Sequence, residues 1–181
     1  MSADGLRRLS LEEVEPELRV ELEPTVKRLG YFGEFFQVFS AVPGAISAFM
    51  VYTKAVKAPL TDSENEVLAL TVCAALGDSY ERIQHERLSV RLGLDPGWVA
   101  AAEGRDGADM ASLSPQETVL RELALAIIAT HGKGSQVAVA AANAVIGAQK
   151  TAAALLQITR FMSIATLCNA LELSVPVPSV F

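Results

Sequence analysis

The fold of this chain is decided by the stretch Glu66-Val-Leu-Ala-Leu-Thr-Val-Cys-Ala-Ala-Leu-Gly-Asp-Ser-Tyr-Glu-Arg-Ile-Gln-His85, which predicts two consecutive helices with charged groups on their packed faces. On a helix of 3.6 residues per turn, Glu81 and His85 are i,i+4 neighbours on a stripe that continues to Leu88. Glu66 likewise lies on the apolar side of the helix before it. Because carboxylates are rarely buried without a partner, we expect Glu66, Glu81 and His85 to converge on one polar pocket inside an apolar helical bundle.

The composition predicts a single soluble domain. The chain has 181 residues, of which 51% are hydrophobic, enough to bury a full core. Its formal net charge of -6 argues against nucleic acid or an anionic membrane as a partner, because both bind basic surfaces. Cys73 and Cys168 are far apart, which suits a reducing cytoplasm and supports neither a disulfide nor a zinc site. With no signal peptide and no apolar run long enough to span a bilayer, we expect a cytoplasmic protein.

Helix-start signals and apolar periodicity predict an all-α fold. Almost no segment alternates with period two, as half-buried strands do. Thr61 and Glu64 form a capping box that opens a nearly all-apolar helix to Leu76, which should lie at the centre of the bundle. Ser114 and Glu117 form a second box. The other helices are expected at residues 31–39, 43–57, 78–93, a short segment from 95, 114–130, 135–146 and 151–171.

Three parts are expected along the chain: an N-terminal acidic helical extension at residues 1–30, the helical domain at 31–175, and a tail at 176–181. Ser10 and Glu13 form a capping box for a first helix, which Pro16 and Pro24 should interrupt. The acidic cluster of the extension is expected to be a solvated helix face. Its members are Glu12, Glu13, Glu15, Glu17, Glu21 and Glu23.

The simplest interpretation of Glu81 and His85 is an i,i+4 ion pair on a helix surface, worth a few tenths of a kcal/mol. For Glu66 it is an extra first-turn acid favoured by the helix dipole. A metal site built from Glu66, Glu81 and His85 is geometrically conceivable, but di-iron bundles use Glu-x-x-His pairs on two helices and this chain has one Glu-x-x-x-His. We therefore expect no metal and no cofactor.

The same residues resemble the carboxymuconolactone decarboxylase and alkylhydroperoxidase D-like superfamily. Members with peroxidase activity carry a Glu followed, twelve residues on, by Cys-x-x-Cys-x-x-x-His on adjacent helices. The same count from Glu66 arrives at Asp78, Glu81 and His85, so that acids replace both cysteines. The resemblance therefore implies an alkylhydroperoxidase D-like bundle that has lost thiol peroxidase activity.

The replacement is similar to the decarboxylase branch of the superfamily. There, Tyr-Glu-x-x-x-His, here Tyr80 to His85, precedes a segment like Arg91-Leu-Gly-Leu. Pro43, the run Leu113-Ser-Pro-Gln-Glu117 and the run Asn169-Ala-Leu171 extend the similarity over residues 36–173. The resemblance implies a homo-oligomer, a trimer or hexamer, which the surplus of apolar residues also favours.

A decarboxylase-like reaction implies roles for these side chains. His85 would return a proton to carbon, with Glu81 fixing its tautomer and raising its pKa and Glu66 as a second proton-relay group. The substrate-binding candidates are Asp78, Tyr80, Arg82 and Arg160.

The function expected is that of a cofactor-independent lyase, or a related proton-transfer enzyme, acting on a small oxidised acid or lactone. The alternatives are an alkylhydroperoxidase-like antioxidant protein that has lost the Cys-x-x-Cys motif, and a non-catalytic member of the fold that binds a small ligand or acts structurally.

Overall fold

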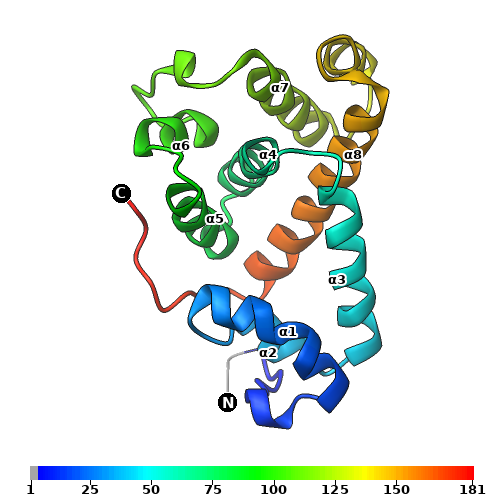
Figure 1. Ribbon diagram of the computed structural model, residues 1–181, viewed down its shortest axis with the longest axis vertical. Coiled ribbons are helices and arrows are strands. Elements are labelled where there is room, and N and C mark those ends of the chain that lie inside the picture. Colours follow the sequence, from blue (N-terminus) through cyan, green and yellow to red (C-terminus); the bar gives the residue numbers. More distant parts are fainter. Residues whose placement is uncertain (1–3) are drawn as a thin grey trace.

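The computed structural model of the protein describes residues 4–181, and over that range all regular structure is helical (Figure 1), which confirms the predicted all-α fold. Residues 1–3 of the expected N-terminal extension lie outside the described residues. The elements are η1 Leu11–Glu13, α1 Pro16–Leu29, α2 Glu34–Phe39, α3 Pro43–Lys57, α4 Asp62–Ala75, α5 Ser79–Arg91, α6 Pro96–Glu103, η2 Met110–Ser112, α7 Pro115–Thr130 and α8 Gln136–Ala170.

Helix α4 lies at the centre of the bundle, as its composition predicts, with α5, α6, α7 and α8 around it (Figure 1). Its first turn is closed by the predicted capping box, in which Thr61 and Glu64 each bond the other's backbone N–H. Every residue from 64 to 73 is buried. Burying each of its large apolar side chains, such as Leu68, contributes about 1.5–3 kcal/mol, so this helix anchors the core.

Helix α5 follows after a tight turn at Gly77, whose φ of 68° suits glycine. Asp78 is its N-cap, and one carboxylate oxygen accepts the backbone N–H groups of Tyr80 and Glu81. This cap fixes the rotation of α5 from its first turn. It therefore decides which side chains of α5 face α4 and α8.

Helices α1 and α2 lie at the bottom of the molecule in Figure 1, and α3 runs up its side toward α4. Their apolar side chains form a second buried cluster with residues of α8. The predicted interruption of the first helix is confirmed at Pro16 and is wrong at Pro24. The Ser10 capping box opens only η1, whereas Pro16 occupies the first position of α1, where no N–H is needed. Pro24 stays inside α1 on its exposed face, because Leu18 and Leu22 bury the opposite face. The six acids of the extension are all exposed, as predicted.

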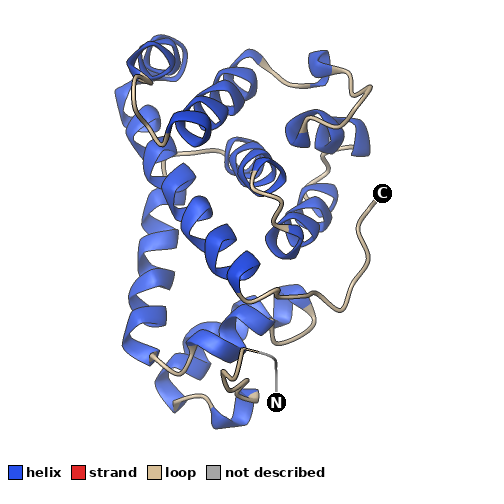
Figure 2. Ribbon diagram, turned by 180° about the vertical axis from the view of Figure 1, so that it is seen from behind, coloured by secondary structure: helices blue, strands red, loops and turns tan. Residues whose placement is uncertain are grey.

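Helix α8 is broken at Gly147, where φ is 79° and ψ is 164°. The two arms, residues 136–146 and 148–170, correspond to the two late helices that the sequence predicts (Figure 2). An 18-residue window of α8 is apolar enough to cross a membrane by composition. Of that window, 56% is buried inside the bundle, which is the pattern of a core helix.

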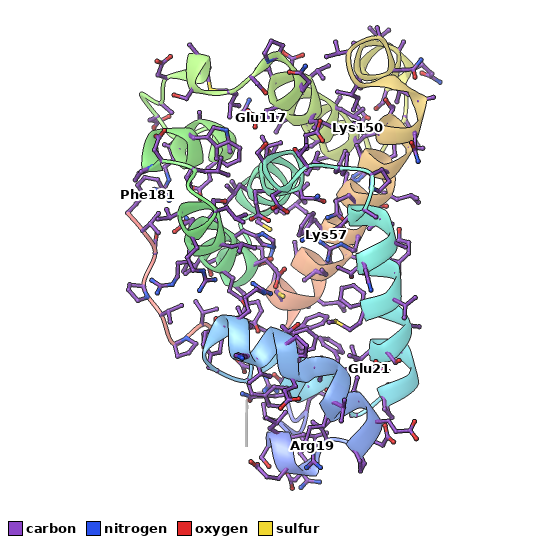
Figure 3. All side chains as sticks on the ribbon, in the orientation of Figure 1. Arg19, Glu21, Lys57, Glu117, Lys150 and Phe181 are labelled. Carbon is purple, nitrogen blue, oxygen red and sulfur yellow. The ribbon has the colours of Figure 1, made fainter. Side chains whose placement is uncertain are left out.

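The C-terminal tail runs along the outer side of α5 and ends beside α6, where Phe181 is labelled in Figure 3. The Phe181 ring lies 3.8 Å from Arg105 Cζ. The fully buried carboxylate of Glu86 accepts bonds from the Ser179 hydroxyl and the Val180 N–H. The tail is therefore attached to α5 through Glu86, which lies about 100° around the helix from His85.

Candidate active site

Glu66, Glu81 and His85 converge on one site between α4 and α5, as the helical periodicity predicts. His85 Nδ1 lies 2.7 Å from Glu66 Oε2, which makes a direct hydrogen bond. His85 Nε2 lies 3.7 Å from Glu81 Oε2, which is an ion pair beyond hydrogen-bonding distance. Glu66 is 1% exposed, and Ser89 Oγ donates weakly to its Oε2 at 3.4 Å. Glu66 is thus a buried partner of His85 and not a solvated first-turn acid.

The roles of the two carboxylates differ from those predicted. Glu66, not Glu81, binds Nδ1 of His85 and so fixes the plane of the ring. Glu81 lies near Nε2, the nitrogen that remains for a substrate. Glu66 makes the closer contact because α5 crosses α4 with His85 next to Glu66. Glu81 lies one turn before His85 on the same helix, and its carboxylate stays 3.7 Å from the ring.

The charges of the two acids keep His85 protonated. Burial opposes the imidazolium, but the Glu66 carboxylate, and to a lesser extent Glu81, raise the pKa of His85 to about 9. Burial would also raise the pKa of Glu81, yet the positive charges of His85 and Arg160 hold it below its ordinary value. At neutral pH the site therefore holds an imidazolium between two carboxylates.

This charged group opens into a cavity of about 250 Å³ bounded by α1, α2, α3, α4, α5 and α8. Lys57, at the end of α3, lies between α3, α4 and α8 in Figure 3 and lines it. Aromatic and aliphatic side chains form much of the wall, among them Phe35, Phe36, Phe49, Met50, Leu88 and Phe161. The volume and lining suit a small, partly apolar organic molecule.

Tyr80 lines the cavity, and Asp78 lies directly behind it. The Tyr80 hydroxyl accepts the backbone N–H of Phe35 at 3.1 Å. A Cβ added at Gly33 would lie 2.7 Å from this hydroxyl, so glycine is needed there. Burial and the charge of Glu81 raise the pKa of Asp78 to about 6, and its Oδ2 is buried without a hydrogen-bond partner among residues 4–181. Asp78 is therefore a helix cap that does not line the cavity.

Only one of the two arginine candidates lines the cavity. Arg82 does not line the cavity, because its guanidinium pairs with Glu86 and Glu103 on the outer side of the helix. Burial and the Glu86 carboxylate raise the pKa of Glu103 to about 7. Arg160 lines the cavity from α8 and is 8% exposed. The structure thus brings Arg160 to the site and leaves Arg82 outside it.

Sequence reasoning missed several cavity residues. Arg28 comes from α1, which the sequence assigns to a separate extension, and Lys57 comes from α3. Gln157 is fully buried in α8, where a glutamine three residues before Arg160 in an apolar run was a usable signal. Asn65 is also buried, and an asparagine next to Glu66 in a nearly all-apolar helix was a similar signal of a polar site.

Both cysteines are buried, Cys73 at 0% and Cys168 at 1% exposure, and neither forms a disulfide. Burial, and the nearby charges of Glu81 and Asp78, raise the pKa of both thiols. Neither residue lines the cavity. In the part of the chain from residue 4 onward, no group of three or more His, Cys, Asp and Glu side chains is arranged to hold a metal ion.

The fold and the site together describe an all-α bundle with a buried acid–imidazole–acid group facing a small cavity. The fold matches the crystal structure of an alkylhydroperoxidase AhpD core, an uncharacterized peroxidase-related protein from Ralstonia eutropha JMP134, with a TM-score of 0.76. The match covers 91% of this chain and 88% of that chain at 17% sequence identity. The chain therefore has the alkylhydroperoxidase D-like fold. The sequence matches no family model and no curated protein.

Proposed function

We propose that this protein is a cofactor-independent lyase, or a related proton-transfer enzyme, that acts on a small oxidised acid or lactone, as in the decarboxylase-type branch of the carboxymuconolactone decarboxylase and alkylhydroperoxidase D-like superfamily. The observation that carries the proposal is the placement of His85 in the cavity wall, with Nδ1 bonded to Glu66 and Nε2 beyond hydrogen-bonding distance of Glu81. A fixed acid next to an enclosed, partly apolar space is the arrangement that proton delivery to carbon requires.

In the decarboxylation of an acid whose carboxylate is vinylogous to a carbonyl, the C–C bond to that carboxylate breaks and CO₂ leaves. The electron pair passes into the conjugated enolate, which forms where the positive charge of His85 stabilises it. The Nε2 proton of His85 is then transferred to carbon, and a proton from water restores the imidazolium. Glu81, beside Nε2, balances the charge of the ring and can pass that proton on.

The peroxidase alternative is less well supported by the side chains. The structural neighbour is called peroxidase-related, but peroxide reduction by thiols needs an accessible thiolate and a resolving thiol. Here both thiols are buried, have a raised pKa and do not line the cavity. A non-catalytic binding role would use the same cavity, and the experiment below separates it from catalysis.

The proposal is tested by incubating carboxylated lactones and unsaturated keto acids with the protein in deuterated water and measuring CO₂ release and deuterium incorporation at carbon. We expect turnover of at least one compound and a loss of about 10²- to 10⁴-fold in His85→Gln. His131→Gln is the matched control, because His131 is exposed at the C-terminus of α7. Equal rates in His85→Gln and wild type, or binding without turnover across the panel, would exclude the proposed enzyme.

A further inference from the structure

Arg160 is a buried cation with no carboxylate in direct contact among residues 4–181, although the charge of Glu81 acts on it from a greater distance. It is 8% exposed, lines the cavity, and has its Nε bonded to Gln157 Oε1 at 2.9 Å. Among residues 4–181, no carboxylate lies within 4.0 Å of its guanidinium, and its two Nη nitrogens donate to none of these residues. Burial lowers the pKa of Arg160. A buried guanidinium left in this state is costly, so its retention in the wall of a cavity points to a ligand that supplies the missing acceptor.

The environment of Arg160 leaves its donors free for the cavity. Its Cζ lies 4.0 Å from the centroid of the Phe161 ring and 5.8 Å from that of Phe49. A guanidinium that stacks on an aromatic ring does so through its flat face, which leaves its in-plane N–H groups free for other acceptors. The planar edge of Arg160 therefore remains available for a carboxylate, which it matches in geometry.

A buried chain of amides holds the guanidinium in place. Gln157 Nε2 donates to Asn65 Oδ1 at 3.0 Å, and Asn65 Nδ2 donates to the backbone oxygen of Thr61 at 2.9 Å. Since the amide nitrogen of Gln157 is occupied by Asn65, its oxygen is directed at Arg160 Nε. Gln157 supplies a neutral acceptor, which orients the guanidinium without neutralising it.

Arg160 and His85 contact the same ring. The imidazole packs edge-on against Phe161 with centroids 5.2 Å apart, while the guanidinium lies over that ring. The two cations are therefore held at a fixed separation within the length of one small molecule. A carboxylate on Arg160 would place the body of the same molecule beside His85 Nε2.

We propose that Arg160 is the anion-binding residue of the cavity, that Gln157 is its positioning residue, and that the substrates are small acids with a carboxylate on Arg160 and an apolar body among the aromatic side chains. This inference rests on the proposed function for the chemistry at His85 but not for binding. The carboxylate on Arg160 is the anchoring group and not the one that leaves, because an ion pair to a leaving carboxylate would stabilise the ground state and slow its loss.

The test compares small carboxylic acids with their neutral amides as ligands. Benzoate, cyclohexanecarboxylate and phenylacetate, each beside its amide, are titrated into wild type, Arg160→Gln and Arg19→Gln by calorimetry. Arg19, at the far end of the molecule on α1 (Figure 3), is the matched control. We expect at least one acid to bind about tenfold or more tightly than its amide in wild type and Arg19→Gln, and to lose this preference in Arg160→Gln.

Two further measurements keep the inference testable if Arg160→Gln does not fold. In wild type, the Nε–H NMR signal of Arg160 should shift when the acid binds and stay in place with the amide. Gln157→Glu should give Arg160 an internal carboxylate, so we expect weaker acid binding with the amide unaffected. A panel in which no acid binds better than its amide, or an acid preference that survives in Arg160→Gln, would overturn the inference.

The binding test of Arg160 and the turnover test of the proposed function can fail separately. If His85→Gln retains the preference for acids and no compound is turned over by wild type, Arg160 stands as an anion site and the proposed function fails. If turnover occurs but the acid preference does not depend on Arg160, the function stands and this inference fails.

Discussion

Replacing Glu66 with glutamine should lower the pKa of His85, because it removes one buried charge and keeps the side-chain volume. In the wild-type protein the two carboxylates outweigh burial and hold this pKa at about 9, against an ordinary value of 6.5. That difference corresponds to about 3 kcal/mol of preference for the imidazolium over the neutral ring. Glu66, in direct contact with Nδ1, supplies the larger part. We therefore expect the pKa of His85 to fall by about one pH unit or more in Glu66→Gln.

The assay is an NMR titration of the imidazole signals. The chain has two histidines, and the exposed His131 gives a reference signal in the same spectrum. Glu81→Gln is the matched control, since it removes the same charge from a position 3.7 Å from the ring and should lower the pKa less. A wild-type pKa at or below 6.5, or a pKa unchanged in Glu66→Gln, would refute the electrostatic account of the site.

The same pKa predicts how stability depends on pH. Because the folded-state pKa of His85 is raised, its contribution to the free energy of unfolding is fully present below pH 6.5 and is lost as the pH rises through about 9. Denaturant unfolding of the wild type should show a decrease of up to about 3 kcal/mol across this window, and Glu66→Gln a smaller one. Asp78 and Glu103, with pKa values of about 6 and 7, alter stability mainly below that window.

Three further predictions follow from other parts of the molecule. Peroxide turnover should be no faster in wild type than in the Cys73→Ala, Cys168→Ala variant, and a large loss in that variant would assign the activity to a thiol. Glu86→Gln should destabilise the protein by about 1–3 kcal/mol in thermal unfolding, because it removes the charged acceptor that the partly exposed Arg82 and Arg105 share with the tail, and an unchanged melting temperature would contradict this. The exposed apolar side chains of α3 and α8, such as Val51 and Leu156, should be covered by other copies of the chain, so light scattering at micromolar concentration should give the mass of a trimer or hexamer and not of a monomer.

The parts of the fold that follow from local rules could be predicted from the sequence. The capping boxes at Thr61 and Ser114 and the cap at Asp78 begin their helices where expected. The central position of α4 follows from a run without an exposed polar face. The prediction that Pro24 interrupts the first helix was wrong. A proline on an exposed helix face is tolerated when the opposite face is buried, as it is here by Leu22.

The composition of the site could be predicted only within the two helices that carry its motif. Glu81 and His85 share a face by periodicity, but the same rule also makes Arg82 an i,i+3 neighbour of His85, and only its pairing with Glu86 and Glu103 turns it away from the site. Which acid binds which nitrogen of His85 depends on how α5 crosses α4, which no local pattern specifies. Packing between distant segments also decides that α1 and α3 supply part of the cavity wall. The same packing brings Arg160 of α8 and His85 of α5 to one cavity.

The charge arrangement also determines the direction in which the site can move a proton. A general acid or base works best when its pKa is near the working pH. With a pKa of about 9, His85 is almost entirely protonated at neutral pH, so it is ready to donate and rarely able to accept. Only a strongly basic centre, such as the carbon of an enolate, draws a proton readily from such an acid. Under the proposed function, a carboxylate bound at Arg160 would add a further negative charge near the imidazolium and strengthen this bias, so that protonation of carbon is favoured over its deprotonation.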